Sequence, residues 1–184
     1  MQLKPFFLLP FLLVLASCSV TKKAAKEEPP QMPRKTPSQI SAPAHKKTFS
    51  KPLKIDREEF VSFAKTLLGT PYRYGSADPE NGLDCSGFVT YVFGHFNVKC
   101  PRTTVDFTNE GKDVELEDAQ PGDIILFTGS DNSTGIVGHM GIITANEKMI
   151  RFIHSASGKN IGVILNDLAG YYKTHFVKVI RILE

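Results

Sequence analysis

The sequence predicts one α+β domain, in which helices come first and a mainly antiparallel, meandering β-sheet of about five strands follows. Two observations lead to this prediction. Apolar residues recur with helical spacing between residues 56 and 96, and short apolar runs of strand length replace them after Pro121. The chain has 184 residues and a globular composition, which suits one such domain with appendages.

The first predicted helix begins near Asp56, because Asp56 and Glu59 have the spacing of a capping box. Apolar residues at helical spacing continue to Leu68, and Gly69-Thr70-Pro71 ends the helix.

The second predicted helix starts at Cys85 and ends near His95. Asp84 stands at its N-cap position, so Cys85 lies in the first turn. The positive end of the helix dipole and the free N–H groups there favour a thiolate, the form of cysteine that attacks carbonyl carbons. The alternative interpretation is that Cys85 is a small buried hydrophobic residue.

Residues 101–110 predict a further short helix, which Gly111 closes. The predicted strands are residues 124–127, 139–145, 148–154, 161–165 and 176–182.

Two histidines lie in the hairpin that the second and third of these strands form. If Asn146-Glu147 is a two-residue turn, Ala145 pairs with Lys148 and His139 faces His154 across the ladder. Directly opposed residues have Cβ atoms about 4.5–5.5 Å apart, so one imidazole can orient the other. A slip of one residue would separate the two histidines.

These residues together predict nucleophilic catalysis. Cys85 attacks a carbonyl carbon, His139 takes the thiol proton and returns it to the leaving amine, and His154 orients His139. Backbone N–H groups at the helix start, including that of Cys85, are available to the oxyanion. A zinc site made of the same residues is the alternative, but metal-ligand spacings are absent, so we expect no metal and no cofactor. The three other histidines, His45, His95 and His175, are expected at the surface.

Residues 1–17 predict a signal peptide, because Lys4 precedes an apolar run too short to span a membrane. Leu15-Ala16-Ser17-Cys18 resembles a bacterial lipobox, which implies cleavage before Cys18 and lipid attachment there. Ser19, in place of Asp, favours anchoring in the outer membrane, facing the periplasm. A plain signal peptide with an incidental Cys18 is the alternative.

Residues 18–54 predict a disordered tether, since scattered prolines and basic residues cannot form a core. The net charge of the chain is +3, but its basic excess lies in the tether, and residues 55–184 are predominantly acidic. This distribution argues against a nucleic-acid partner and fits an arm near anionic lipid or cell-wall polymer. We expect a monomer.

Lipidation of Cys18 would leave two cysteines, Cys85 and Cys100, in an oxidising compartment. Cys100 is expected as a small apolar residue. A disulfide between the two would inactivate the proposed enzyme, and this pairing stays open at the level of sequence.

Several segments resemble, in order, the motifs of the NlpC-type cell-wall endopeptidases, across residues 55–184. These segments are Gly69-Thr70-Pro71-Tyr72-Arg73-Tyr74-Gly75, Leu83-Asp84-Cys85-Ser86-Gly87-Phe88-Val89, Pro101-Arg102-Thr103, Pro121-Gly122-Asp123-Ile124 and Gly138-His139-Met140-Gly141-Ile142. The resemblance implies a circularly rearranged papain-like fold and a catalytic triad of Cys85, His139 and His154.

The resemblance also implies roles for the residues around the triad. Tyr72 would shape the oxyanion or substrate site, and Asp84 and Ser86 would bind the free amine of a peptidoglycan stem peptide. The bonds cleaved in the family join D-Glu to the diamino acid or the diamino acid to D-Ala. Two features depart from the family: Gly75-Ser76 replaces Gly-Gly, and the stretch from His139 to His154 is long.

The leading interpretation is therefore a lipid-anchored cysteine peptidase of the cell envelope that hydrolyses stem peptides. A catalytically silent murein-binding lipoprotein is the first alternative, although such a protein would be expected to lose at least one member of the triad. An amidase or acyltransferase that uses the same triad is the second, and the shape of the cleft would discriminate it.

Overall fold

The computed structural model describes residues 47–158 and 162–184. The predicted signal peptide, the lipidation site at Cys18 and most of the predicted tether lie outside these residues. In the described part of the chain, every helix is too short or too polar to serve as a membrane span.

The first half of the domain is mainly helical, as predicted. Its elements are α1 (Arg57–Thr66), β1 (Ala77–Asp78), β2 (Gly82–Leu83), α2 (Cys85–His95) and α3 (Thr104–Phe107). The Asp56 carboxylate caps α1 by accepting a hydrogen bond from the N–H of Glu59 at 2.8 Å. The capping box therefore starts α1 as its sequence predicts.

The second half forms a six-stranded antiparallel sheet with the order β3-β8-β4-β5-β6-β7. Its strands are β3 (Lys112–Val114), β4 (Ile124–Thr128), β5 (Val137–Asn146), β6 (Ile150–Ser155), β7 (Val163–Asp167) and β8 (Phe176–Arg181). The expected α+β class and antiparallel meander are confirmed. The sequence did not reveal β3, because this strand is short and mostly polar, nor the helix α4 (Gly170–His175) before β8.

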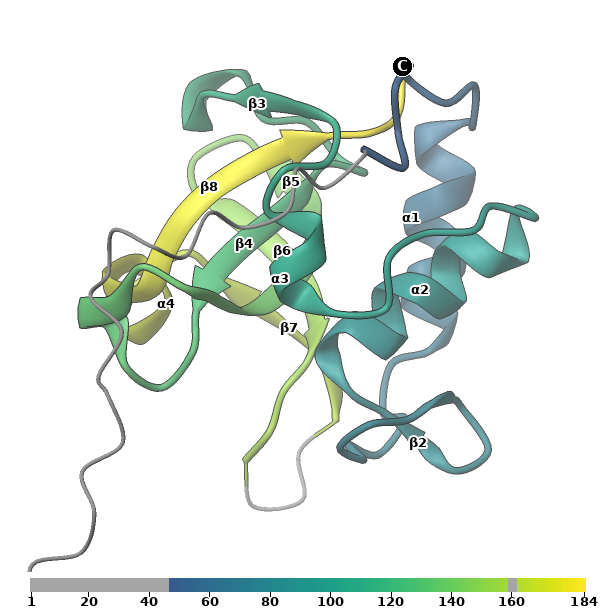
Figure 1. Ribbon diagram of the computed structural model, residues 1–184, viewed down its shortest axis with the longest axis horizontal. Helices are drawn as coiled ribbons and strands as arrows, with labels where there is room; N and C mark the ends of the chain where they lie inside the picture. The colour runs from purple at the N-terminus through teal and green to yellow at the C-terminus, as the bar shows by residue number, and fades with distance from the viewer. Residues whose placement is uncertain (1–46, 159–161) are drawn as a thin grey trace, which may run out of the picture. The chain divides into compact units, whose positions relative to one another are not determined.

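Side chains of β4 alternate between two hydrophobic clusters, one on each face of the sheet. Ile124 and Leu126 belong to the cluster shared with α1 and α2, which lie side by side next to the sheet in Figure 1. Ile125 and Phe127 belong to the other cluster, which α4 and a short 3₁₀ helix, η2 (Leu116–Asp118), complete. The sheet therefore has two buried faces near its centre.

The folded part of the chain begins earlier than the predicted boundary at residue 55. The ring of Phe49 is buried and stacks on Phe93 with a centroid distance of 5.7 Å. The carboxylate of Glu110 accepts hydrogen bonds from the backbone N–H groups of Thr48 and Phe49, both at 2.9 Å. The sequence did not reveal these contacts, because one aromatic residue among prolines and lysines gives no periodic signal.

Asp123, in the predicted turn before β4, links distant parts of the domain. Its carboxylate is fully buried and is bonded by Arg57 of α1 at 3.0 Å and by Arg181 of β8 at 2.7 Å. Arg57 also donates to the backbone carbonyl of Leu183 near the end of the chain. This part of the Pro121-Gly122-Asp123-Ile124 motif therefore has a structural role.

The hairpin of β5 and β6 has a different register from the predicted one. Ile143 pairs with Phe152 rather than with Ile150, and a bulge follows Ile143. The strands are joined by a turn longer than two residues, since Asn146 pairs with Ile150. The predicted direct pairing of the two histidines is thus wrong. The slip is an even number of positions, however, so both stay on the same face of the sheet.

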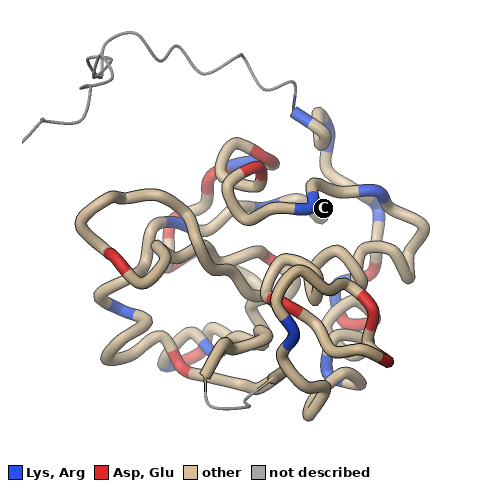
Figure 2. Tube along the Cα trace, turned by 60° about the horizontal axis from the view of Figure 1, so that its bottom comes forward, with Lys and Arg blue, Asp and Glu red and all other residues tan. Residues whose placement is uncertain are grey.

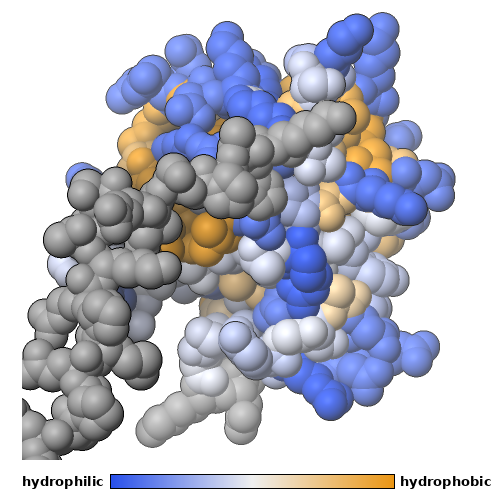
Figure 3. Space-filling model, viewed as in Figure 1, coloured by the Kyte–Doolittle hydropathy of each residue, from blue (hydrophilic) through white to orange (hydrophobic). Residues whose placement is uncertain are grey.

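Charged and apolar residues are both dispersed over the surface of the described domain. Basic and acidic positions lie near one another in Figure 2, and some form exposed ion pairs, such as Arg151 with Asp167 and Lys178 with Asp113, both at 2.8 Å. On the face shown in Figure 3, hydrophobic residues form separate patches between hydrophilic ones.

Candidate active site

Cys85 is the first residue of α2, and its position depends on the residues on either side. The Asp84 carboxylate caps the helix by accepting a hydrogen bond from the N–H of Gly87 at 2.6 Å. The loop before β1 then crosses closely over the helix. A Cβ atom on residue 87 would lie 2.0 Å from the carbonyl oxygen of Ser76, so only glycine fits there. In the Asp-Cys-Ser-Gly sequence, Asp84 therefore caps the start of α2, and Gly87 allows the loop at Ser76 to pack against the helix.

The Cys85 thiol is protonated more strongly than its place at a helix start predicts. Burial raises its pKa to about 11, and the charge of Asp84 raises it further. The backbone N–H groups of Ser86, Cys85 and Met140 act in the opposite direction, but their effect is smaller. The expected thiolate is therefore wrong for the site without substrate, although the contact with Met140 places the sulfur beside the start of β5.

His139 and His154 are joined by a short hydrogen bond. Nε2 of His139 lies 2.7 Å from Nδ1 of His154, and the rings meet nearly edge to face at 84°. In the observed register His154 faces Gly141, where a Cβ atom would come within 3.1 Å of the Cβ of His154. The missing side chain at Gly141 therefore leaves room for His154 to reach diagonally to His139.

Two further residues contact His154 on the side away from His139. Nε2 of His154 lies 2.9 Å from Oδ1 of Asn166 on β7, and the hydroxyl of Tyr172 on α4 lies 3.3 Å from the same nitrogen. Neither residue stood out in the sequence. The available signal for Asn166 was its place two residues after Ile164, at the end of a predicted strand. On that strand it would be a diagonal neighbour of His154 on the same face of the sheet.

Both histidines are neutral near pH 7. His154 is fully buried, and this burial lowers its pKa to about 4. Burial also lowers the pKa of the half-buried His139 to about 3, with a contribution from the neighbouring His154. Because the pKa of Cys85 is raised, the proton stays on sulfur and His139 is free to act as a base.

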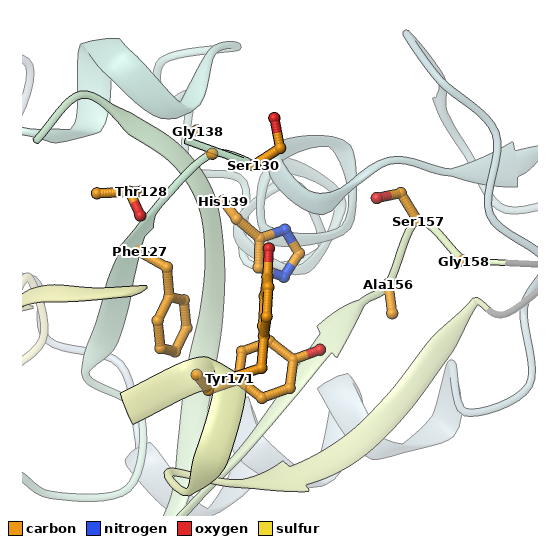
Figure 4. Close-up of a pocket in the computed structure, with 11 residues that line it drawn as sticks. Phe127, Thr128, Ser130, Gly138, His139, Ala156, Ser157, Gly158 and Tyr171 are labelled. Atoms are coloured by element: carbon orange, nitrogen blue, oxygen red, sulfur yellow. The ribbon is translucent and has the colours of Figure 1, made fainter. Parts of the chain in front are cut away.

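Two pockets, the Cys85 lobe and the His139 lobe, share Gly138 as a lining residue. The Cys85 lobe, of about 420 Å³, is lined by Tyr72, Tyr74, Gly75, Asp84, Cys85, Ser86, Arg102, Thr103, Thr104 and Gly138. The His139 lobe has a volume of about 360 Å³, and Figure 4 shows His139 in it with Phe127, the segment 156–158 after β6, and Tyr171. The predicted Cys85, Tyr72, Asp84 and Ser86 therefore line one pocket, His139 lines a second that shares Gly138 with it, and His154 lines neither.

Comparison with known proteins confirms the family that the sequence motifs resemble. The family model described as "NlpC/P60 family" matches residues 69–181. The chain belongs to the NlpC/P60 family.

Individual relatives agree with this family assignment. The bifunctional muramidase/DL-endopeptidase CwlT of Bacillus subtilis is 31% identical over 72% of this chain and 39% of its own length. A "Probable endopeptidase" of Haemophilus influenzae is 38% identical over 62% of this chain and 67% of its own. The crystal structure of an NlpC/P60 family protein from Bacillus cereus has a TM-score of 0.64 and 25% identity, covering 72% of this chain and 42% of that one. The chain spans less than half the length of CwlT.

Within this NlpC/P60 domain, Asp84 and Ser86 form a cluster with Arg102. Arg102 binds both oxygens of Asp84, at 3.0 and 2.7 Å, and donates to the Ser86 hydroxyl at 2.9 Å. These contacts lower the pKa of Asp84 although burial opposes them, so Asp84 is a carboxylate. Arg102 belongs to a recognised motif, but the sequence did not reveal that it pairs with Asp84.

Tyr72 also lies in the Cys85 lobe, where the NlpC/P60 resemblance expects it. Burial raises the pKa of its hydroxyl, and the negative charge of Asp84 adds to the effect. The group therefore keeps its proton and can donate a hydrogen bond.

The structure also describes two further histidines, His95 and His175, and one further cysteine, Cys100. His45 is outside the described residues. His95 is exposed but stacks on Phe63 at 3.6 Å. His175 is not the expected surface residue: it is 8% exposed and stacks on Tyr171 at 3.8 Å. Cys85 and Cys100 are both free thiols.

Proposed function

We propose that this protein is a cysteine peptidase that hydrolyses peptide bonds in peptidoglycan stem peptides. The observation that carries the proposal is the hydrogen-bonded pair His139–His154, together with the contact between the sulfur of Cys85 and the N–H of Met140, the residue after His139. The names of the relatives, which include endopeptidases, and the family of the chain support it.

The reaction begins with proton transfer inside the cleft. Nε2 of His139 is occupied by His154, so Nδ1 is the nitrogen that accepts the thiol proton. As the proton leaves, the sulfur of Cys85 attacks the carbonyl carbon, and a negative charge develops on the carbonyl oxygen. The backbone N–H of Cys85 and the hydroxyl of Tyr72 stabilise this oxyanion.

Collapse of the tetrahedral intermediate breaks the C–N bond, and His139 returns its proton to the leaving amine. The remaining thioester is attacked by water, which gives a proton to His139. The C–S bond then breaks, a carboxylate product leaves, and Cys85 recovers its thiol proton. Throughout this cycle His154 holds the ring of His139 in place.

Asp84 and Ser86 bind the free amine of the stem peptide in this proposal. Oδ2 of Asp84 has Arg102 as its protein donor at 2.7 Å, and a carboxylate oxygen can accept more than one hydrogen bond. An ammonium group in the Cys85 lobe can therefore share Asp84 with Arg102. The candidate bonds in this proposal are those that join D-Glu to the diamino acid and the diamino acid to D-Ala.

The proposed location rests on the sequence outside the described residues. A lipid on Cys18 would hold the protein as a monomer on the outer membrane, facing the periplasm. Residues 19–46 would then link the anchor to the domain.

The test uses the full chain purified in detergent and reduced, incubated with purified peptidoglycan and with its soluble muropeptides. We expect new peptide fragments whose masses identify the cleaved bond. Cys85→Ala should abolish them, whereas the matched control Cys100→Ala should retain them. No cleavage by the folded wild-type protein would refute the peptidase and favour a murein-binding lipoprotein. Transfer of an acyl group without hydrolysis would favour an acyltransferase, and hydrolysis of an amide bond outside the stem peptide would favour an amidase.

A further inference from the structure

We propose that Asn166 is a positioning residue whose amide oxygen fixes the tautomers of both active-site histidines. In doing so it leaves Nδ1 of His139 without a proton, which is the state that a general base requires. The inference rests on the proposed peptidase mechanism, and no sequence motif considered above includes Asn166.

The backbone places Asn166 beside His154 by the same geometry that places His154 beside His139. His154 pairs with Ile164 across the ladder of β6 and β7, so Asn166 lies two residues further along, on the same face. His139, His154 and Asn166 therefore form a diagonal line across three neighbouring strands. The hydrogen bonds along this line are 2.7 and 2.9 Å long.

The direction of the hydrogen bonds along this line follows from the chemistry of its last member. The amide oxygen of Asn166 carries no hydrogen, so Nε2 of His154 must donate. Nδ1 of the neutral His154 is then an acceptor, which requires Nε2 of His139 to carry a hydrogen. Nδ1 of His139 consequently has a free lone pair, which is what proton abstraction from the thiol needs.

Tyr172 makes the presence of this acceptor important. Its hydroxyl, 3.3 Å from Nε2 of His154, can either accept or donate a hydrogen bond. If the hydroxyl donated, every hydrogen bond along the line would reverse, and Nδ1 of His139 would become protonated and unable to act as a base. With its amide oxygen turned towards His154, Asn166 disfavours this arrangement, because two acceptors would then face each other at 2.9 Å.

Among the groups that contact His154, Asn166 is the one that sets its tautomer. Among the described residues, the titratable side chains that contact His154 are His139 from β5 and Tyr172 from α4. The charged pair Arg151–Asp167 belongs to the same two strands as His154 and Asn166 but occupies positions on the opposite face. Asp167 is therefore a matched control in the same strand.

The experiment compares the full-length wild type with Asn166→Leu, Asn166→Asp and Asp167→Ala. Leucine has nearly the shape of asparagine but no acceptor, whereas aspartate keeps the acceptor and adds charge. We would measure kcat and KM on a muropeptide, the pH profile of kcat/KM, and the tautomers by NMR with isotope-labelled histidine. Thermal unfolding of each variant would identify loss of folding.

Asn166→Leu should lower kcat on the order of 10- to 100-fold with little change in KM, and should move the proton of His139 to Nδ1. Asn166→Asp should keep both Nε2–H tautomers. Its charge should raise the pKa of the histidine pair and thus move the acidic limb of kcat/KM to higher pH. Asp167→Ala should behave as wild type. An unchanged tautomer in Asn166→Leu, or an unchanged acidic limb in Asn166→Asp, would overturn the proposal.

The two proposals fail in distinguishable ways. If wild-type protein cleaves no peptidoglycan, the peptidase proposal fails, but the NMR spectra still report whether Asn166 sets the tautomers. If cleavage depends on Cys85 but the histidine tautomers are the same in wild type and Asn166→Leu, only the positioning role of Asn166 fails.

Discussion

Cys85 shows how burial outweighs a helix terminus in setting the charge of one residue. The helix dipole contributes on the order of 0.3–1 kcal/mol, and one pKa unit corresponds to about 1.4 kcal/mol. The dipole can therefore lower a thiol pKa by less than one unit. Burial and the neighbouring Asp84 instead raise the pKa of Cys85 to about 11. In the proposed mechanism the nucleophile is consequently generated during attack, when His139 takes the proton.

This charge state predicts how Cys85 reacts with a thiol reagent. In the full chain carrying Cys18→Ala and Cys100→Ala, the rate of alkylation by iodoacetamide should rise continuously between about pH 7 and pH 10, because the thiolate fraction grows towards a pKa of about 11. The same variant with Cys85→Ala gives the background rate. A rate that reaches its plateau below pH 7 would instead show a stable thiolate–imidazolium pair.

At the level of elements, β5 and β6 together position the histidines. Their register is shifted from the one that a two-residue turn would give, yet both histidines remain on one face because side chains alternate along a strand. The diagonal contact between the rings then depends on Gly141, which faces His154 without a side chain. The hairpin supplies the orientation, and the glycine supplies the space.

Gly141→Ala should therefore impair catalysis through the hairpin. The added Cβ would meet the carbonyl oxygen of Ile153 at 2.8 Å and the Cβ of His154 at 3.1 Å, so β6 or His154 must move. We expect a loss of about 1–3 kcal/mol in the free energy of unfolding and a kcat at least tenfold lower. Chemical denaturation and peptidase assays measure the two effects.

Gly135→Ala would not be a neutral control, since Gly135 has a positive φ of 65°. Gly94→Ala in α2 is better, because no atom lies within 4 Å of the added Cβ and alanine favours helix. If Gly141→Ala matched Gly94→Ala in both kcat and stability, the spatial role of Gly141 would be wrong.

Across the whole molecule, a few buried polar groups connect segments that are distant in sequence. Asp123 joins α1, the start of β4 and β8 through two arginines, and Glu110 holds the segment around Phe49 against α2. Such links bring the helical half and the sheet into the arrangement that the cleft requires, because Cys85 belongs to the first half and His139 to the second.

Asp123→Asn should destabilise the whole domain. The change removes a fully buried negative charge and leaves Arg57 and Arg181 without their shared partner. Loss of one member of a buried ion pair costs about 3–5 kcal/mol, and the partial exposure of both arginines places the expected loss near the lower end. The control Asp167→Asn breaks an exposed pair and should cost less than about 1 kcal/mol. Equal losses in urea unfolding would contradict the assigned role of Asp123.

The sequence by itself determined the α+β class, the capped helices at Asp56 and Asp84, and the cleft residues Cys85 and His139. These features depend on caps, periodicity and motifs, which are local along the chain. The sequence also placed His154 on the correct face, because the alternation of side chains survives a slip of two residues.

Only the tertiary structure decided the register of β5 and β6, the contacts of Asn166 and Tyr172 with His154, and the pairing of Arg102 with Asp84. It also decided the protonation of Cys85 and the place of Phe49 in the core. Each of these depends on which residues, far apart in sequence, become neighbours, and on how much water their contact excludes. Neither the long-range contacts nor the exclusion of water can be read from a local pattern, because both arise when the strands pair and the helices pack on the sheet.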